Sequence, residues 1–314
     1  QVDGPYLLPS NFLYEADISQ GGSVLNAFDY AAPQSVDEAL SLLSNGKQVG
    51  LLAGGTDIIA AMKEGRRKID LLLDLKKIPD TQVLSYDAEN GLRVGAATAC
   101  CKIYENEDVR KKYPALVDST SLIGSIQVQS RASIGGNLCN SSPAADSIPT
   151  LIVLSGTCHI VGPNGTRTVA VEDFCTGPGQ NVLGNGEFLV SLTFPSPAPN
   201  SGAFFLRFIP RNEMDIAVVN AAVSVVLSDD HNSIVSARVA IGAVAPTPLL
   251  VTEAGDALAG QAISDDVIEK AAEASRAAAN PITDMRGTIE QRVHLAGVPT
   301  RRALQGAIER AKES

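Results

Sequence analysis

The sequence lacks tryptophan, has few aromatic residues (4 %) and contains no long apolar run. A membrane-spanning helix needs roughly 18 to 20 apolar residues, so no integral membrane segment is expected. The first residues do not have the basic segment and apolar stretch of a secretory signal peptide. The five cysteines form an odd set without C-x-x-C spacing, and the three histidines stand apart. This usage predicts reduced thiols in the cytoplasm and no metal site.

Basic residues are also in the minority. Against 35 acidic residues stand 25 lysines and arginines, which gives a net charge of -10. This balance argues against nucleic acid or an anionic membrane as the main partner. It leaves room for a bound phosphate, because exposed charges are screened beyond about 8 Å at physiological salt. With 314 residues, of which 45 % are hydrophobic, the chain is long enough for two packed domains.

The first half of the chain has an α/β texture after an arm rich in glycine, serine and asparagine. Ser35 and Glu38 form a capping box that predicts the start of a helix. A short buried strand then runs directly into Gly54-Gly55. The order predicted for this unit is a helix at 36–43, a strand at 49–53, a helix at 58–63 and a strand at 71–75.

Further along, the pattern changes at a run of three prolines within residues 195–199, which neither a strand nor a helix continues. Before the prolines we expect a strand from residue 92, helices at 116–123 and 147–154, and a hairpin at 158–171. After them we expect an antiparallel meander of strands at 203–209, 216–227 and 234–241 and helices at 266–279, 289–295 and 300–312, the last capped by Thr300. The predicted division is an arm at 1–27, one domain at 28–198 and a second at 199–314.

Two pairs of adjacent glycines mark the candidate chemistry. Gly54-Gly55 and Gly135-Gly136 are each expected between a short strand and a polar segment that starts a helix. Such a pair can turn successive N–H groups inward and lets a phosphate approach the backbone. Thr56, Ser133 and Asn137 could add side-chain donors. Neither site is a G-x-G-x-x-G fingerprint or a P-loop, and each alone fits a simple tight turn, but two together can hold a pyrophosphate from both sides. The glycines at 177–179 and 184–186 are interpreted as loops.

The residues around these glycines carry a family resemblance. Ala-Gly-Gly-Thr-Asp at 53–57 and Ala-Ser-Ile-Gly-Gly-Asn at 132–137 resemble the two FAD motifs of the flavoprotein subunits of xanthine dehydrogenase and carbon monoxide dehydrogenase. The similarity extends in order through residues 28–30, 214–217, 284–287 and 300–304. It implies an α+β fold: a two-part FAD-binding module of the vanillyl-alcohol-oxidase (PCMH) type, followed by a C-terminal antiparallel-sheet and helix domain of the CO dehydrogenase flavoprotein type.

The resemblance also implies an oxidoreductase flavoprotein that works within a complex. The implied partners are a large molybdopterin subunit and a small [2Fe–2S] subunit, assembled as a dimer of heterotrimers (a heterohexamer). Electrons would pass from molybdenum through [2Fe–2S] clusters to the FAD of this chain, then to NAD⁺, a quinone or another acceptor. The large subunit would choose the substrate, so purines, carbon monoxide, N-heterocycles and aldehydes all remain open. The additional iron–sulfur insertion of 4-hydroxybenzoyl-CoA reductase is not recognisable.

Residue roles follow from the matching positions. The FAD contacts expected around the glycine motifs are Leu52, Ala53, Gly54, Gly55, Thr56, Asp57, Ile58, Ile123, Gly124, Ser133, Ile134, Gly135, Gly136 and Asn137. Asp146 would accept a hydrogen bond from a cofactor hydroxyl, or cap a helix. Leu189 would pack on an aromatic ring of the cofactor, or belong only to the core. Arg207 stands where xanthine dehydrogenases place a lysine near the flavin, and its alternative is a surface arginine on a strand. No residue is proposed as catalytic, because the cofactor carries the redox chemistry.

Two other functions fit parts of the same pattern. A self-contained FAD-dependent oxidase or reductase of this fold would need a substrate pocket, and often a histidine or cysteine that binds flavin covalently. The histidines lie outside both glycine motifs, which disfavours it. A nucleotide-binding or assembly protein without redox activity would show no flavin spectrum and would take up no FAD.

Overall fold

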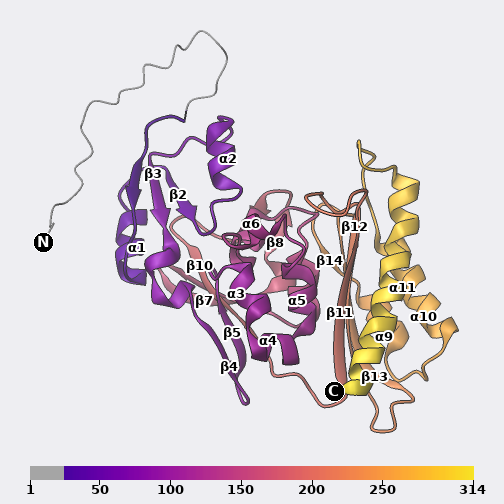
Figure 1. Cartoon of the computed structure of the whole chain (residues 1–314). Coiled ribbons are helices and arrows are strands. Elements are labelled where there is room, and N and C mark those ends of the chain that lie inside the picture. Colours follow the sequence, from indigo (N-terminus) through magenta and orange to yellow (C-terminus); the bar gives the residue numbers. More distant parts are fainter. Residues whose placement is uncertain (1–24) are drawn as a thin grey trace, which may run out of the picture.

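The computed structural model describes residues 25–314. The predicted arm at 1–27 lies outside this part of the chain, apart from residues 25–27. Three sheets follow one another across the molecule, from the N-terminal strands in indigo at one end to the C-terminal helices in yellow at the other (Figure 1).

The first sheet is parallel and small. Its elements are β1 (Asp29–Ala31), α1 (Val36–Leu43), β2 (Val49–Leu52), α2 (Ile58–Lys63) and β3 (Leu71–Asp74), with strand order β1-β3-β2. Ser35 caps α1 by accepting a hydrogen bond from the Glu38 N–H, as predicted. The Glu38 carboxylate accepts from the N–H of Gln34 rather than from that of Ser35, so the capping box is shifted by one residue. The strand, glycine turn, helix and strand expected here are confirmed.

The central sheet is antiparallel, in the order β4-β5-β10-β6-β7. Its strands are β4 (Leu84–Asp87), β5 (Gly91–Gly95), β6 (Thr157–Gly162), β7 (Gly165–Ala170) and β10 (Phe188–Phe194), and a separate hairpin joins β8 (Cys175–Gly177) to β9 (Gln180–Asn181). The helices between β5 and β6 are α3 (Cys100–Glu105), α4 (Glu107–Lys112), α5 (Pro114–Thr120), α6 (Ile126–Gln129), α7 (Ile134–Asn140) and α8 (Ser147–Val153). Short 3₁₀ turns are η1 (Leu75–Lys77), η2 (Pro79–Thr81) and η3 (Val171–Asp173). The predicted β6–β7 hairpin is confirmed.

The C-terminal sheet is the predicted antiparallel meander, extended by one short strand. It contains β11 (Ser201–Phe208), β12 (Val219–Leu227), β13 (Ile234–Gly242) and β14 (Leu249–Leu250) in that order. The helices that follow are α9 (Thr252–Leu258), α10 (Asp265–Ala278) and α11 (Ile289–Glu313). Phe205 and Ala222 of this sheet join the hydrophobic core that also contains α5 and α8, so the two halves of the chain share a core. Parallel and antiparallel sheets in succession, with grouped helices, confirm the α+β class.

The two helices predicted at 289–295 and 300–312 form one continuous helix, α11. The predicted N-cap at Thr300 is therefore wrong. Helix α11 runs through Pro299, and its N-cap is Thr288, whose hydroxyl accepts from the Gln291 N–H. The Thr300 hydroxyl donates to the carbonyl of Ala296 inside the helix. Pro299 is buried, so packing keeps the helix continuous where local sequence rules favour a break. Helix α9 was not predicted. No helix within residues 25–314 combines the length and apolarity needed to cross a membrane.

Candidate cofactor-binding cleft

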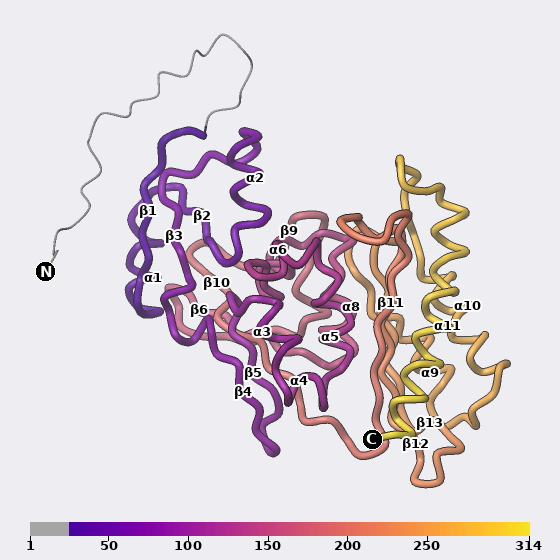
Figure 2. The backbone as a smooth tube through the Cα atoms, viewed as in Figure 1, coloured from indigo at the N-terminus to yellow at the C-terminus, as the bar shows by residue number. Residues whose placement is uncertain are grey.

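A cavity of about 580 Å³ opens where the first sheet meets the central sheet and its helices. This volume is typical of small-molecule and cofactor sites. Its walls come from the end of β2, helix α2, the residues after β5, helix α7, the β8–β9 hairpin and the start of β10. Figure 2 shows the connection from β2 to α2 close to α6, the helix that precedes the second glycine motif.

The first glycine motif forms a turn packed directly against the segment that precedes α7. A Cβ atom on Gly54 would lie 2.2 Å from the carbonyl oxygen of Arg131. Gly55 has φ +85°, a left-handed conformation that favours glycine. Gly54 is therefore required by a backbone contact between the two motifs, in addition to any contact with a ligand.

The second glycine motif differs from the prediction. Gly135 and Gly136 lie in the first turn of α7 rather than between a strand and a helix. Ser133 is extended and caps this helix by accepting from the Gly136 N–H. A Cβ on Gly135 would lie 2.4 Å from the carbonyl oxygen of Ala96, so glycine lets the helix start close to the end of β5. The motif is thus a helix N-terminus, which also favours an anion.

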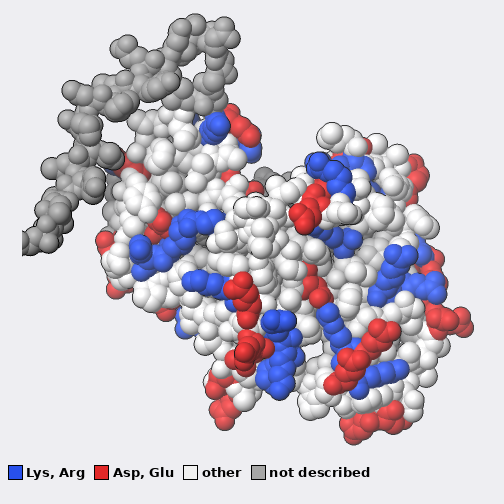
Figure 3. Space-filling model, viewed as in Figure 1, with Lys and Arg blue, Asp and Glu red and all other residues white. Residues whose placement is uncertain are grey.

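Unpaired backbone donors surround the first turn. The N–H groups of Gly54, Gly55, Thr56 and Asp57 donate no hydrogen bond to any residue in the described range 25–314. All four residues line the cavity, together with arginines at positions 66 and 67. Free donors near the start of a second helix fit a pyrophosphate, which needs hydrogen bonds from the backbone and nearby positive charge. Acidic and basic side chains are interspersed over the visible face of the molecule (Figure 3).

Asn137 links the cavity to the next helix. Its Oδ1 accepts hydrogen bonds from the Ser147 hydroxyl at 2.6 Å and the Ser147 N–H at 3.4 Å. Asn137 thereby supplies the hydrogen bond at the start of α8. Asp146 holds the N-cap position of α8, as the cap alternative predicts, but its side chain makes no capping hydrogen bond.

Asp146 is instead part of a buried polar cluster with Arg207 and Asn220. Arg207 Nη1 donates to Asp146 Oδ2 at 2.5 Å, and their side chains are 5 % and 10 % exposed. Burial raises the pKa of Asp146 above its ordinary value, while Arg207 and Asn220 oppose this rise. Arg207 Nε and Asn220 Oδ1 are buried without a partner in the described chain. The surface alternative for Arg207 is therefore wrong.

The cavity brings together most of the predicted contact residues. Those in its wall are Ala53, Gly54, Gly55, Thr56, Asp57, Ile58, Ile123, Ser133, Gly135, Gly136, Asn137 and Leu189. Outside the wall are Leu52, Gly124, Ile134, Asp146 and Arg207. Leu189 lines the cavity and also belongs to the central core, so its core interpretation is confirmed and its packing on a cofactor ring stays a prediction.

The β8–β9 hairpin contributes wall residues that the sequence interpretation missed, among them Gly179 and Asn181. The Asn181 side chain donates to the carbonyl of Cys139, and the Gly179 N–H donates to that of Ser141, so α7 holds the hairpin against the cavity. The glycines at 177–179 were a usable signal. No helix is predicted after them, and for this reason their pattern favours simple loops.

The cysteines of the described chain are free thiols. Burial raises the pKa of Cys100 to about 12, so this thiol stays protonated at neutral pH. Within residues 25–314, no group of three or more His, Cys, Asp or Glu side chains is arranged to hold a metal ion.

Comparison with known proteins places this cleft in a family. The family model described as the FAD binding domain in molybdopterin dehydrogenase matches residues 26–197, and that of the CO dehydrogenase flavoprotein C-terminal domain matches residues 204–307. The chain therefore belongs to the family of FAD-binding subunits of molybdenum hydroxylases, and is an oxidoreductase flavoprotein subunit. The resemblance drawn from the two glycine motifs is confirmed.

Individual relatives are similar to this chain along nearly their full length. The chain is 32 % identical to the carbon monoxide dehydrogenase medium chain of Afipia carboxidovorans, with 91 % of this chain and 98 % of the relative covered. It is 28 % identical to the xanthine dehydrogenase FAD-binding subunit of Escherichia coli O157:H7, with 90 % and 98 % covered. A solved carbon monoxide dehydrogenase from Hydrogenophaga pseudoflava superposes with a TM-score of 0.87 at 30 % identity, covering 91 % of this chain and 99 % of that one.

Proposed function

We propose that the cleft holds FAD with its pyrophosphate between the Gly54-Gly55 turn and the start of α7, and that the chain relays electrons within a molybdenum hydroxylase. The observation that carries this proposal is the row of N–H groups at residues 54–57, which donate to no residue of the described chain and belong to residues that line the cavity together with the first turn of α7. When bound, FAD supplies the redox chemistry, accepting electrons and passing them to an acceptor such as NAD⁺ or a quinone.

The residues of the chain bind and orient the cofactor. The N–H groups would hydrogen-bond the phosphate oxygens, and Arg67 would neutralise part of their charge, whereas Arg66 is already paired with Glu64. Leu189 gives the cavity an apolar wall against which a flavin or adenine ring can pack. The Asp146–Arg207 pair does not line the cavity. It is connected to the cavity wall through Ser147, the neighbour of Asp146, whose hydroxyl donates to Asn137. The Arg207 guanidinium is paired with the Asp146 carboxylate, so its positive charge next to the site is balanced by a negative one.

We further propose that the donors of these electrons are [2Fe–2S] clusters in a small partner subunit, and that a large molybdopterin subunit completes a dimer of heterotrimers. The names of the relatives support this, since they are medium chains or FAD-binding subunits and this chain covers 98 % of their length. The two family matches support a domain boundary near residue 198. The free thiols favour a cytoplasmic location.

Gentle purification of the chain from its native source tests this assembly. The expected result is equal amounts of this chain, a large chain containing molybdenum and a small chain containing iron and acid-labile sulfide. Acid precipitation is expected to release the flavin into the supernatant. Flavin retained on the acid-precipitated chain, together with substrate turnover by the chain alone, would replace the subunit proposal with a self-contained flavin oxidase or reductase.

A further inference from the structure

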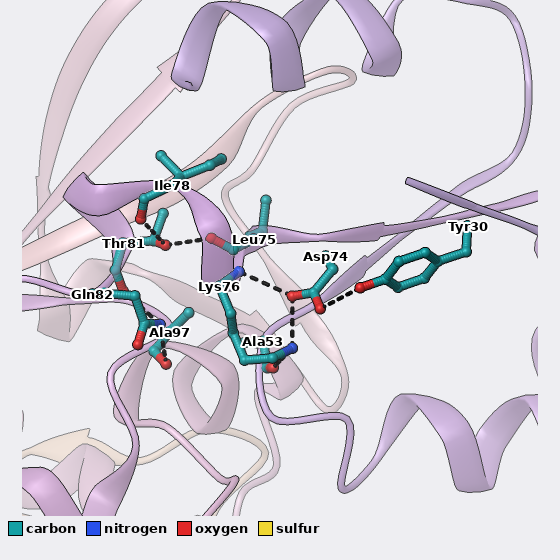
Figure 4. Close-up of polar contacts among 9 residues, drawn as sticks. All are labelled: Tyr30, Ala53, Asp74, Leu75, Lys76, Ile78, Thr81, Gln82 and Ala97. Carbon is teal, nitrogen blue, oxygen red and sulfur yellow. Dashed lines mark hydrogen bonds and ion pairs between the residues drawn. The ribbon is translucent and has the colours of Figure 1, made fainter. Parts of the chain in front are cut away.

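A part-buried ion pair of Lys76 and Asp74 contacts Ala53, the residue before the first glycine pair (Figure 4). Lys76 Nζ lies 2.6 Å from Asp74 Oδ1 and donates a hydrogen bond of 2.8 Å to the carbonyl oxygen of Ala53. The Lys76 and Asp74 side chains are only 20 % and 9 % exposed. A half-buried lysine whose ammonium is bonded to both a carboxylate and a backbone carbonyl indicates a specific local role, since most lysine side chains are exposed.

Both members of the pair are held in place by neighbouring groups. Tyr30 donates its hydroxyl to Asp74 Oδ2 at 2.8 Å, and the Lys76 N–H donates to Asp74 Oδ1 at 2.9 Å. The Thr81 hydroxyl donates to the carbonyl of Leu75 at 2.6 Å, which fixes the 3₁₀ turn that carries Lys76. The ammonium group is therefore positioned by β1, β3 and η1 before any ligand arrives.

The carbonyl that Lys76 contacts belongs to the same peptide group as one of the free donors. The Ala53 C=O and the Gly54 N–H are the two ends of one amide, and the Gly54 N–H donates to no described residue. A charged donor on the oxygen of an amide polarises the whole group, so its N–H becomes a stronger donor. The same bond fixes the plane of the peptide, and therefore the direction in which the N–H points.

We propose that Lys76 is a positioning residue for the cofactor diphosphate, acting through the Ala53–Gly54 peptide. The ammonium does not touch the ligand; it orients and polarises the amide whose N–H binds a phosphate oxygen. Asp74 moderates the effect by neutralising part of the lysine charge. This inference rests on the proposed binding of FAD in the cleft.

The test is the dissociation constant of FAD for the full-length chain, measured by quenching of flavin fluorescence after removal of bound cofactor. Lys76→Met is expected to raise the dissociation constant about tenfold, the effect of losing a charge-assisted hydrogen bond. Lys77→Met is the matched control, because it removes the same charge from the next residue, which is exposed and outside the cavity wall. It is expected to stay within about twofold of the natural chain.

Three further variants separate positioning from simple packing or charge balance. Lys76→Arg keeps a cation with several donors and is expected to recover most of the affinity. Asp74→Asn leaves Lys76 un-neutralised and is expected to tighten FAD binding about two- to threefold, an effect that a purely structural ion pair would not produce. The double variant Asp74→Asn with Lys76→Met keeps the net charge and is expected to bind as weakly as Lys76→Met.

The outcomes decide between the alternatives. Equal affinities in Lys76→Met and Lys77→Met would overturn the inference, and so would full recovery in the double variant, because the loss would then come from an unbalanced Asp74 charge. If Lys76→Met does not fold, the Asp74→Asn variant decides: weaker FAD binding overturns the inference about Lys76, and tighter FAD binding supports it. A natural chain that binds no FAD would instead refute the proposed function itself.

Discussion

The buried pair between Arg207 and Asp146 provides a sharp test of the structure beside the cleft. Arg207→Met keeps a long apolar side chain but leaves the Asp146 carboxylate buried without its strongest partner. Breaking a buried ion pair from one side typically costs about 3 to 5 kcal/mol. The side chains are 5 % and 10 % exposed, so solvent screening reduces this cost little. The expected loss is therefore about 3 kcal/mol or more in the free energy of unfolding at pH 8.

The loss should depend on pH in a defined direction. The pKa of Asp146 already lies above its ordinary value because of burial, and Arg207 limits this rise. Removing Arg207 raises the pKa further. A carboxyl group whose pKa is raised in the folded state destabilises the protein only at pH values at which it is ionised. The loss in the free energy of unfolding is therefore complete at high pH and disappears as the carboxyl group becomes protonated. The deficit of Arg207→Met should therefore shrink between pH 8 and pH 5.

Urea unfolding of the flavin-free chain at several pH values measures this deficit, because bound ligand would otherwise stabilise the folded state. The double variant Asp146→Asn with Arg207→Met is the matched control. It removes the unpaired charge and should recover at least half of the lost stability. A deficit below about 1 kcal/mol, or one of equal size at pH 5 and pH 8, would refute the reasoning.

Three further predictions concern other parts of the chain. Gly54→Ala should abolish FAD binding and lower the free energy of unfolding by about 1 to 3 kcal/mol, because its Cβ would lie 2.2 Å from a carbonyl oxygen of the second motif. Gly46→Ala is strained by its φ of +79° but its Cβ meets no atom within 4 Å, so this variant should retain FAD. Equal flavin content in the two variants would contradict the role of the contact at Gly54. Arg292→Met should lower the free energy of unfolding by about 3 kcal/mol in urea, since it leaves two buried backbone carbonyls without their donor; an unchanged urea midpoint would count against it. Alkylation at pH 8, followed by peptide mass spectrometry, should label Cys101 before Cys100, because burial raises the pKa of Cys100 to about 12. Faster labelling of Cys100 would contradict the buried position of its thiol.

Local sequence chemistry was sufficient for the first sheet and much of the cleft. Ser35 caps α1 and short apolar runs mark β2 and β3, so the order of elements around Gly54 can be predicted from the sequence. The second motif was misread because Ser133-Ile134-Gly135-Gly136 fits both a tight turn and a capped helix start. Helices as short as α6 and α7 show too little periodicity to decide between the two.

The remaining errors come from contacts between distant residues. Arg207 and Asp146 are 61 positions apart, and no local pattern indicates that they pair. The hairpin containing Asn181 becomes part of the cavity only because α7 binds it across a separation of 42 residues. Pro299 stays inside α11 because the surrounding core buries it, a tertiary effect that overrides the usual preference of proline.

The central claim is that the cleft between the two glycine motifs binds FAD. The most direct measurement is the amount and identity of the flavin that the purified full-length chain retains or takes up, determined by absorbance and by chromatography of the released cofactor. The account predicts one FAD per chain, released without covalent attachment, and its loss in Gly54→Ala but not in Gly46→Ala. A chain that shows no flavin spectrum and takes up no FAD from solution would contradict it.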